Sequence, residues 1–204
     1  MKTRTKVIID WSILLIFCVL LFLSLRIVPI IWRVLLYFFE ESVSYIPIVF
    51  IGTVLLFLLL YVAFARKQKS LSSYVWFGVL TLLFFVVYDY IKDPYDKMHL
   101  CSYFIISFLL FRALHHHIFS QKLYFIGVIF SMSLAMADEY AQMFVAGRTF
   151  SYGDMFADFA AATLGQLYIA LVIKPKLERW RVTLRVKSRI LKSEMKWVRK
   201  HKHY

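Results

Sequence analysis

The apolar residues of this sequence form six long blocks, and this feature constrains the fold more than any other. The blocks cover residues 7–25, 46–65, 74–91, 99–114, 123–137 and 155–173. An α-helix needs about 20 apolar residues to cross the hydrocarbon core of a bilayer. Hydrophobic residues make up 61% of the chain, whereas a soluble domain has about 45–50%. We therefore predict an all-α, polytopic transmembrane helix bundle with about six spanning helices, and we exclude a soluble protein.

A seventh apolar stretch, residues 27–39, is too short to span a bilayer by itself. It contains Pro29 and Arg33, and an arginine at the bilayer centre costs roughly 2.5–3.5 kcal/mol. We predict that this short segment is interfacial, lying flat on the outer surface, or re-entrant and covered by protein.

The basic residues are distributed unevenly between the two ends of the predicted helices. With six spans and a cytoplasmic N-terminus, 20 of the 25 Lys and Arg residues fall on the cytoplasmic side. The others are Arg26, Arg33, Lys92, Lys97 and Arg148. Lysine and arginine are retained in the cytoplasm during membrane insertion. We therefore predict a multi-pass protein of a cell membrane with both termini cytoplasmic.

The chain divides into a transmembrane helical domain, residues 1–173, and a basic cytoplasmic tail, residues 174–204. The tail carries twelve Lys and Arg residues, with apolar residues at helical spacing among them. This pattern predicts an amphipathic basic helix on an anionic leaflet. A strand over the alternating residues 180–187 and binding of RNA or ribosomes are the alternatives for the tail. The net charge of +13 otherwise follows from membrane topology, so no nucleic-acid partner is predicted for the protein.

Three polar clusters lie at the outer ends of the predicted helices. They cover residues 93–99, 138–142 and 147–158. Ionisable side chains at membrane depth are costly and mark functional sites by default. Glu139 and Gln142 are three residues apart, and Asp154 and Asp158 are four apart, so each pair shares a helix face. We predict that the clusters converge, with Glu139 and Arg148 in reach of each other. The alternative is a structural salt-bridge network.

Other polar or reactive residues have simpler interpretations. His115, His116 and His117 are consecutive and cannot share one helix face, so we predict interfacial positions rather than a metal site. Asp10 lies near the cytoplasmic end of the first block, where snorkelling or pairing with Lys6 is expected. The two cysteines fall in different helices and indicate packing rather than a disulfide or metal site.

The order of residues in these clusters resembles the VanZ-like family. The first family motif is matched by Asp96, Lys97, His99, Tyr103 and the segment 109–114. The second is matched by the segment 138–154, Asp158 and Gly165. The resemblance covers about residues 74–173, and Asp158 stands where the family commonly has Asn. It implies a role in the cell envelope and a location in a bacterial plasma membrane, because the family's namesake is associated with resistance to teicoplanin, a glycopeptide that acts on cell-wall precursors.

The first functional hypothesis is a site that binds or processes a lipid-linked, phosphorylated envelope precursor at the outer face. Arg148 and Lys97 would hold the anion, with Gln142 and Asp158 as further ligand-binding residues. His99 would act as a general acid or base. The side chains of Glu139, Asp154 or Asp158 would orient the histidine or hold a divalent cation. No other cofactor is predicted, and no metal is assigned.

Two other hypotheses belong to different functional classes. The chain could be a non-catalytic subunit or assembly factor of a membrane complex, with its polar cluster as a structural latch. A transporter is disfavoured because the sequence has no inverted repeats or paired broken helices. Whether the protein is an enzyme is left open, since no Ser or Cys nucleophile stands beside a base. The predicted partners are the lipid bilayer, an anionic lipid or lipid-linked precursor and, under the second hypothesis, other membrane subunits.

Overall fold

The computed structural model describes residues 2–67, 69–145 and 148–173, and its regular secondary structure over these ranges is helical. The α-helices are α1 (Lys2–Phe39), α2 (Ile46–Leu60), α3 (Leu71–Tyr90), α4 (Pro94–Leu114), α5 (Lys122–Gln142) and α6 (Tyr152–Leu167). A 3-10 turn, η1 (Glu40–Tyr45), joins α1 to α2, and the π-helical turns η2 (Tyr61–Ala65) and η3 (Tyr168–Ile173) extend α2 and α6. The predicted helix and the alternative strand of the tail lie outside the described residues.

Six of the described helical segments are long and apolar enough to cross a membrane. They are Arg4–Phe39, Ser42–Ala65, Leu71–Tyr90, Asp96–Leu114, Lys122–Gln142 and Tyr152–Ile173. Large apolar side chains cover their outer faces: Phe57, Leu82 and Phe125 are each about two-thirds exposed. Exposure of so much apolar surface to water is energetically unfavourable, whereas contact of the same surface with lipid is favourable. The prediction of an all-α polytopic bundle is confirmed, and the chain is a multi-pass membrane protein.

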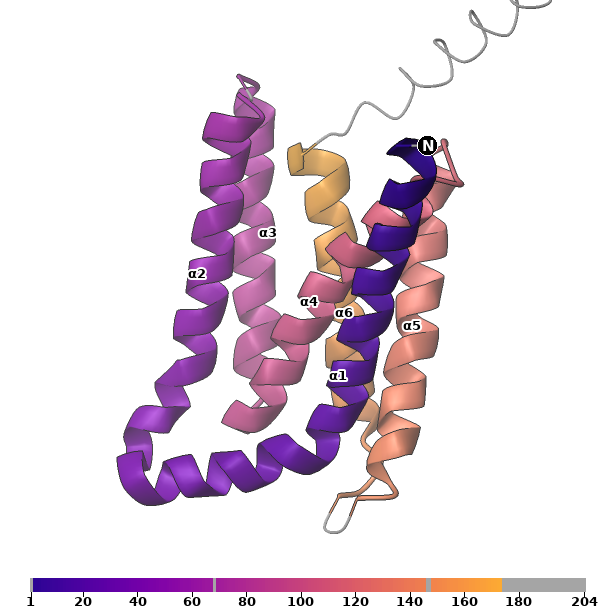
Figure 1. Ribbon diagram of the computed structural model, residues 1–204. Helices are drawn as coiled ribbons and strands as arrows, with labels where there is room; N and C mark the ends of the chain where they lie inside the picture. Colours follow the sequence, from indigo (N-terminus) through magenta and orange to yellow (C-terminus); the bar gives the residue numbers. More distant parts are fainter. Residues whose placement is uncertain (1, 68, 146–147, 174–204) are drawn as a thin grey trace, which may run out of the picture.

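Residues 27–39 form the second half of α1 rather than a separate segment. Pro29 lies inside this helix, where its ring removes a backbone hydrogen bond and favours a bend. Figure 1 shows the lower part of α1 turning and running sideways across the end of the bundle toward α2. Residues 27–39 therefore do not form a separate span, and their interfacial or re-entrant position stays a prediction. Because the stretch does not cross the bundle, the helices that follow keep the predicted alternation of direction.

Helices α4 and α6 form the centre of the bundle. In each of them 56% of the most apolar stretch is buried, compared with 17–33% in the other spans. Gly165 of α6 allows this close packing, because a Cβ atom there would overlap the Ser107 hydroxyl and lie 3.0 Å from the Phe104 carbonyl oxygen of α4. The Gln166 side chain then donates a buried hydrogen bond to the Ser107 carbonyl, at 3.0 Å. The two helices that carry most of the polar residues are thus held at a fixed distance.

The connections of the bundle lie at two opposite ends (Figure 1). The start of α1, the α2–α3 and α4–α5 connections and the end of η3 lie at one end. The α3–α4 and α5–α6 connections lie at the other. The polar residues of α4, α5 and α6 that were predicted to lie at the outer face are at this second end. The even number of crossings agrees with the predicted placement of both ends of the helical domain on one side.

Candidate functional site

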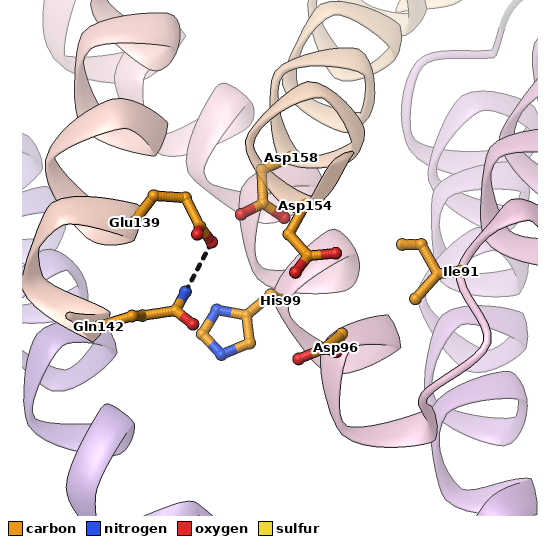
Figure 2. Close-up of a pocket in the computed structure, with 7 residues that line it drawn as sticks. All are labelled: Ile91, Asp96, His99, Glu139, Gln142, Asp154 and Asp158. Carbon is orange, nitrogen blue, oxygen red and sulfur yellow. Dashed lines mark hydrogen bonds between the residues drawn. The ribbon is translucent and has the colours of Figure 1, made fainter. Parts of the chain in front are cut away.

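A small cavity lies among the polar ends of α4, α5 and α6. Figure 2 shows the side chains that line it: Ile91, Asp96, His99, Glu139, Gln142, Asp154 and Asp158. Five of the seven residues that the sequence singled out are in this set, so the predicted convergence is confirmed. The enclosed space is about 10 Å³, which is close to the minimum for one water molecule. The cavity can therefore hold a water or a single ion, but not a lipid headgroup.

Helix α5 contributes Glu139, whose side chain is completely buried. The Gln142 amide donates to Glu139 Oε1 at 2.8 Å, as the three-residue spacing predicted. The backbone N–H of Ser151 donates to Glu139 Oε2 at 3.0 Å. Both oxygens are thus satisfied, and the bonds attach the end of α5 to the residue that precedes α6. A buried carboxylate held in this way stabilises a local arrangement of the chain.

Helix α6 presents two carboxylates on one face. Ser151 caps its N-terminus, where its hydroxyl accepts a hydrogen bond from the Asp154 N–H at 3.2 Å. Asp154 lies in the first turn, which favours a negative charge because of the helix dipole. Asp158 follows one turn deeper and is 2% exposed. The cap therefore sets the start of the helix, and the four-residue spacing aims both carboxylates into the cavity (Figure 2).

The deepest polar group consists of His99, Asp138 and Asp158, one residue from each of α4, α5 and α6. Each offers a ligand atom, and these atoms all lie within 4.8 Å of one another. The distance between His99 Nδ1 and Asp138 Oδ2 is 3.4 Å. Within the described residues, both carboxylate oxygens of Asp138 and Oδ2 of Asp158 accept no hydrogen bond. Two buried carboxylates therefore meet beside the imidazole without the hydrogen bonds that usually compensate burial.

The two predicted anion-binding residues flank the cavity rather than line it. Arg148 Nη1 donates to Asp96 Oδ1 at 2.9 Å, and both side chains are about one-fifth exposed. The ammonium of Lys97 lies 4.4 Å from the centre of the Tyr88 ring, a cation–π contact. Arg148 pairs with Asp96, and Glu139 bonds to Gln142 and Ser151. The prediction that Glu139 and Arg148 lie within hydrogen-bond or one-water reach of each other stays a prediction.

Sequence reasoning did not select Asp96 and Asp138 as site residues. Asp138 immediately precedes Glu139, and Asp96 immediately precedes Lys97, so both lay inside the recognised clusters. Consecutive helical residues point about 100° apart, and either member of each pair could have faced the cavity. The signal that would have found Asp138 is its position three residues after Ala135, on the buried face of α5.

A second polar cluster lies at the opposite end of the bundle. Asp10 of α1 accepts a short hydrogen bond from Arg112 of α4 and a bond from His116 Nε2 at 2.7 Å. Of the two explanations that the sequence offered for Asp10, snorkelling or pairing with Lys6, the pairing is wrong, because its bonds go to Arg112 and His116. Nearby, the Trp11 indole donates to His117 Nε2 at 3.1 Å. These bonds place His116 and His117 in a hydrogen-bonded network that joins α4 and the turn after it to α1.

The comparisons with known proteins do not extend this description. No protein-family model, no curated protein and no solved structure matches the chain. The resemblance to the VanZ-like family consequently has no support beyond the motifs that suggested it. It stays a prediction.

Proposed function

We propose that this protein binds the phosphorylated headgroup of a lipid-linked cell-envelope precursor at the outer face of a bacterial plasma membrane. The observation that carries the proposal is the gathering of both signs of charge at one end of the bundle. Five carboxylates and a histidine surround the cavity or its deepest point, and Arg148 and Lys97 stand beside it. Charged residues in a membrane domain are retained where they act on a ligand.

The partial exposure of Arg148 supports its role as the headgroup contact. Its guanidinium has five donors in a rigid fork, it pairs with Asp96, and 21% of its side-chain surface is exposed. Two oxygens of a phosphate could accept hydrogen bonds from the guanidinium, with Lys97 as a second cation. Because the cavity holds only one water or ion, the headgroup would sit at its mouth and the lipid chain would lie along the apolar helices.

A structural latch in a membrane complex is the second candidate, and specific bonds favour it. The Arg148–Asp96 pair and the bonds of Glu139 join the chain around α6 to α4 and α5. A structural latch explains why these residues are present and how they bond. It does not account for Asp158, whose buried Oδ2 receives no hydrogen bond within the described residues. An unbonded buried carboxylate lowers stability, so its presence favours a working site.

The proposal is tested by binding of defined lipids to the full chain in nanodiscs. Native mass spectrometry would compare a polyprenyl monophosphate, a polyprenyl diphosphate and the unphosphorylated polyprenol. We expect the phosphorylated lipids to bind at least tenfold more tightly, and Arg148→Lys to remove most of this preference while the protein stays folded. Teicoplanin sensitivity of cells that carry each variant should change in parallel. Equal binding of all three lipids would refute the proposal and leave the latch.

A further inference from the structure

The meeting point of His99, Asp138 and Asp158 has the composition and dimensions of a metal site. We propose that these three side chains bind one divalent transition-metal ion, Zn²⁺ or Mn²⁺. Their ligand atoms lie within 4.8 Å of one another. Ligand atoms of a tetrahedral ion with bonds of roughly 2.1 Å lie about 3.4 Å apart, and the distance from His99 Nδ1 to Asp138 Oδ2 is 3.4 Å. Small side-chain rotations would bring the third ligand to the same separation.

An independent observation points to a ligand at this place. Asp158 is 2% exposed and lines the cavity, and no donor among the described residues reaches its Oδ2. Asp138 is completely buried, and neither of its oxygens makes a hydrogen bond in the described part of the chain. Two buried carboxylates so close together repel each other unless a cation or a shared proton lies between them. The adjacent cavity of about 10 Å³ has room for one ion.

The ligand types select the class of metal. An imidazole with two carboxylates suits Zn²⁺ and Mn²⁺, whereas Mg²⁺ and Ca²⁺ prefer oxygen ligands alone. Three protein ligands leave at least one position for water or another oxygen, as in catalytic zinc sites. That position would face the cavity, into which Glu139 and Asp154 also point (Figure 2). The metal gives His99 the role of a ligand rather than of a general acid or base.

This inference does not depend on the proposed lipid, because the ion binds to the protein alone. The experiment therefore uses the full chain without added lipid, purified with a tag that contains no histidine. After treatment with a chelator and dialysis, Zn²⁺ or Mn²⁺ is titrated by calorimetry, and the bound metal is counted by mass spectrometry. We expect one ion per chain. We expect His99→Gln and Asp158→Asn each to weaken its binding at least tenfold.

Matched variants separate this site from adventitious binding. Asp89→Asn removes an exposed carboxylate from α3 near the same end of the bundle, and His117→Gln removes an exposed imidazole from the opposite end. Both should retain the ion with unchanged affinity. Metal that stays bound in Asp158→Asn but is lost in His117→Gln would overturn the assignment, because the histidines 115–117 would then be the ligands.

Because a variant could fail to fold, the ligands are also tested by spectroscopy on the unmodified protein. Electron spin echo measurements on bound Mn²⁺ should show coupling to the nitrogen of one imidazole. A protein that binds neither metal, and whose melting temperature rises in Asp158→Asn, would show that Asp138 and Asp158 share a proton instead. That result would refute the metal site and leave the lipid proposal to its own test.

Discussion

Arg148 Nη1 lies 2.9 Å from Asp96 Oδ1, and this ion pair joins the segment between α5 and α6 to the first turn of α4. The two residues are 52 positions apart in sequence. Their side chains are only about one-fifth exposed, so water screens the pair incompletely. The pair joins two parts of the helix bundle, and under the proposed function it is also the contact for the anionic headgroup.

Substitutions of Arg148 separate these two roles. Arg148→Ala leaves the Asp96 carboxylate half-buried without its partner, and we expect a loss of about 2–3 kcal/mol of stability. Arg148→Lys keeps the charge and should recover at least half of this loss, but it cannot reproduce the planar fork. The melting temperature in detergent measures both effects. If Arg148→Lys is as unstable as Arg148→Ala, the geometry of the fork itself holds the helices together.

A methyl group at Gly165 should disturb the contact between α4 and α6. A Cβ atom there would overlap the Ser107 hydroxyl and lie 2.9 Å from the Ser107 Cβ. Rotation of the hydroxyl cannot relieve the second contact, so the helices must separate. Overpacking of this kind costs about 1–3 kcal/mol, and Gly165→Ala should lower the melting temperature accordingly.

The matched control for this prediction is Gly78→Ala in α3, where no atom lies within 4 Å of the added Cβ. Alanine favours a helix over glycine by about 1 kcal/mol, so this variant should be neutral or slightly stabilised. A Gly165→Ala protein that is as stable as Gly78→Ala would contradict the close approach of the two central helices. Metal binding by Gly165→Ala should also weaken, since α4 and α6 carry His99 and Asp158.

Removal of Asp10 should destabilise the opposite end of the bundle. Asp10 is 9% exposed and accepts bonds from both Arg112 and His116. The Arg112 side chain is 54% exposed and can be rehydrated, so Asp10→Ala should cost only about 1–2 kcal/mol. Lys6→Ala, which removes an exposed residue of the same helix, should leave the melting temperature unchanged. Equal losses of stability in the two variants would instead support the predicted pairing of Asp10 with Lys6.

The orientation of the bundle can be measured with single cysteines at its two ends. Thr149 lies between α5 and α6 and Gln121 precedes α5, and both are exposed and uncharged. In a background with Cys18→Ala and Cys101→Ala, Thr149→Cys should react with an impermeant maleimide on intact cells. Gln121→Cys should react only after permeabilisation, because the basic residues keep that end in the cytoplasm. Labelling in the reverse order would place the polar site on the cytoplasmic side and exclude the proposed outer-face function.

The amino-acid sequence by itself determined the class of protein and the approximate positions of its helices, but not their ends: the apolar block 7–25 became part of the longer helix Lys2–Phe39. In lipid, backbone polar groups must be satisfied within a helix, so long apolar blocks can form little else. Local spacing also determined which side chains share a face, and the bond between Gln142 and Glu139 follows from it. The cost of placing Arg33 in the hydrocarbon core indicated that residues 27–39 do not form a separate span, but it left an interfacial and a re-entrant course open.

Only the tertiary structure decided which residues of different helices meet. Helical periodicity places a side chain on a face, but it does not set the distance or rotation between two helices. Those depend on packing, such as the contact of Gly165 with Ser107, which places His99 beside Asp138 and Asp158. Arg148 lies near several carboxylates along the chain, and its pairing with Asp96 depends on where α4 begins relative to α6. The same reason gave Asp10 a partner 102 residues away instead of the lysine one turn before it.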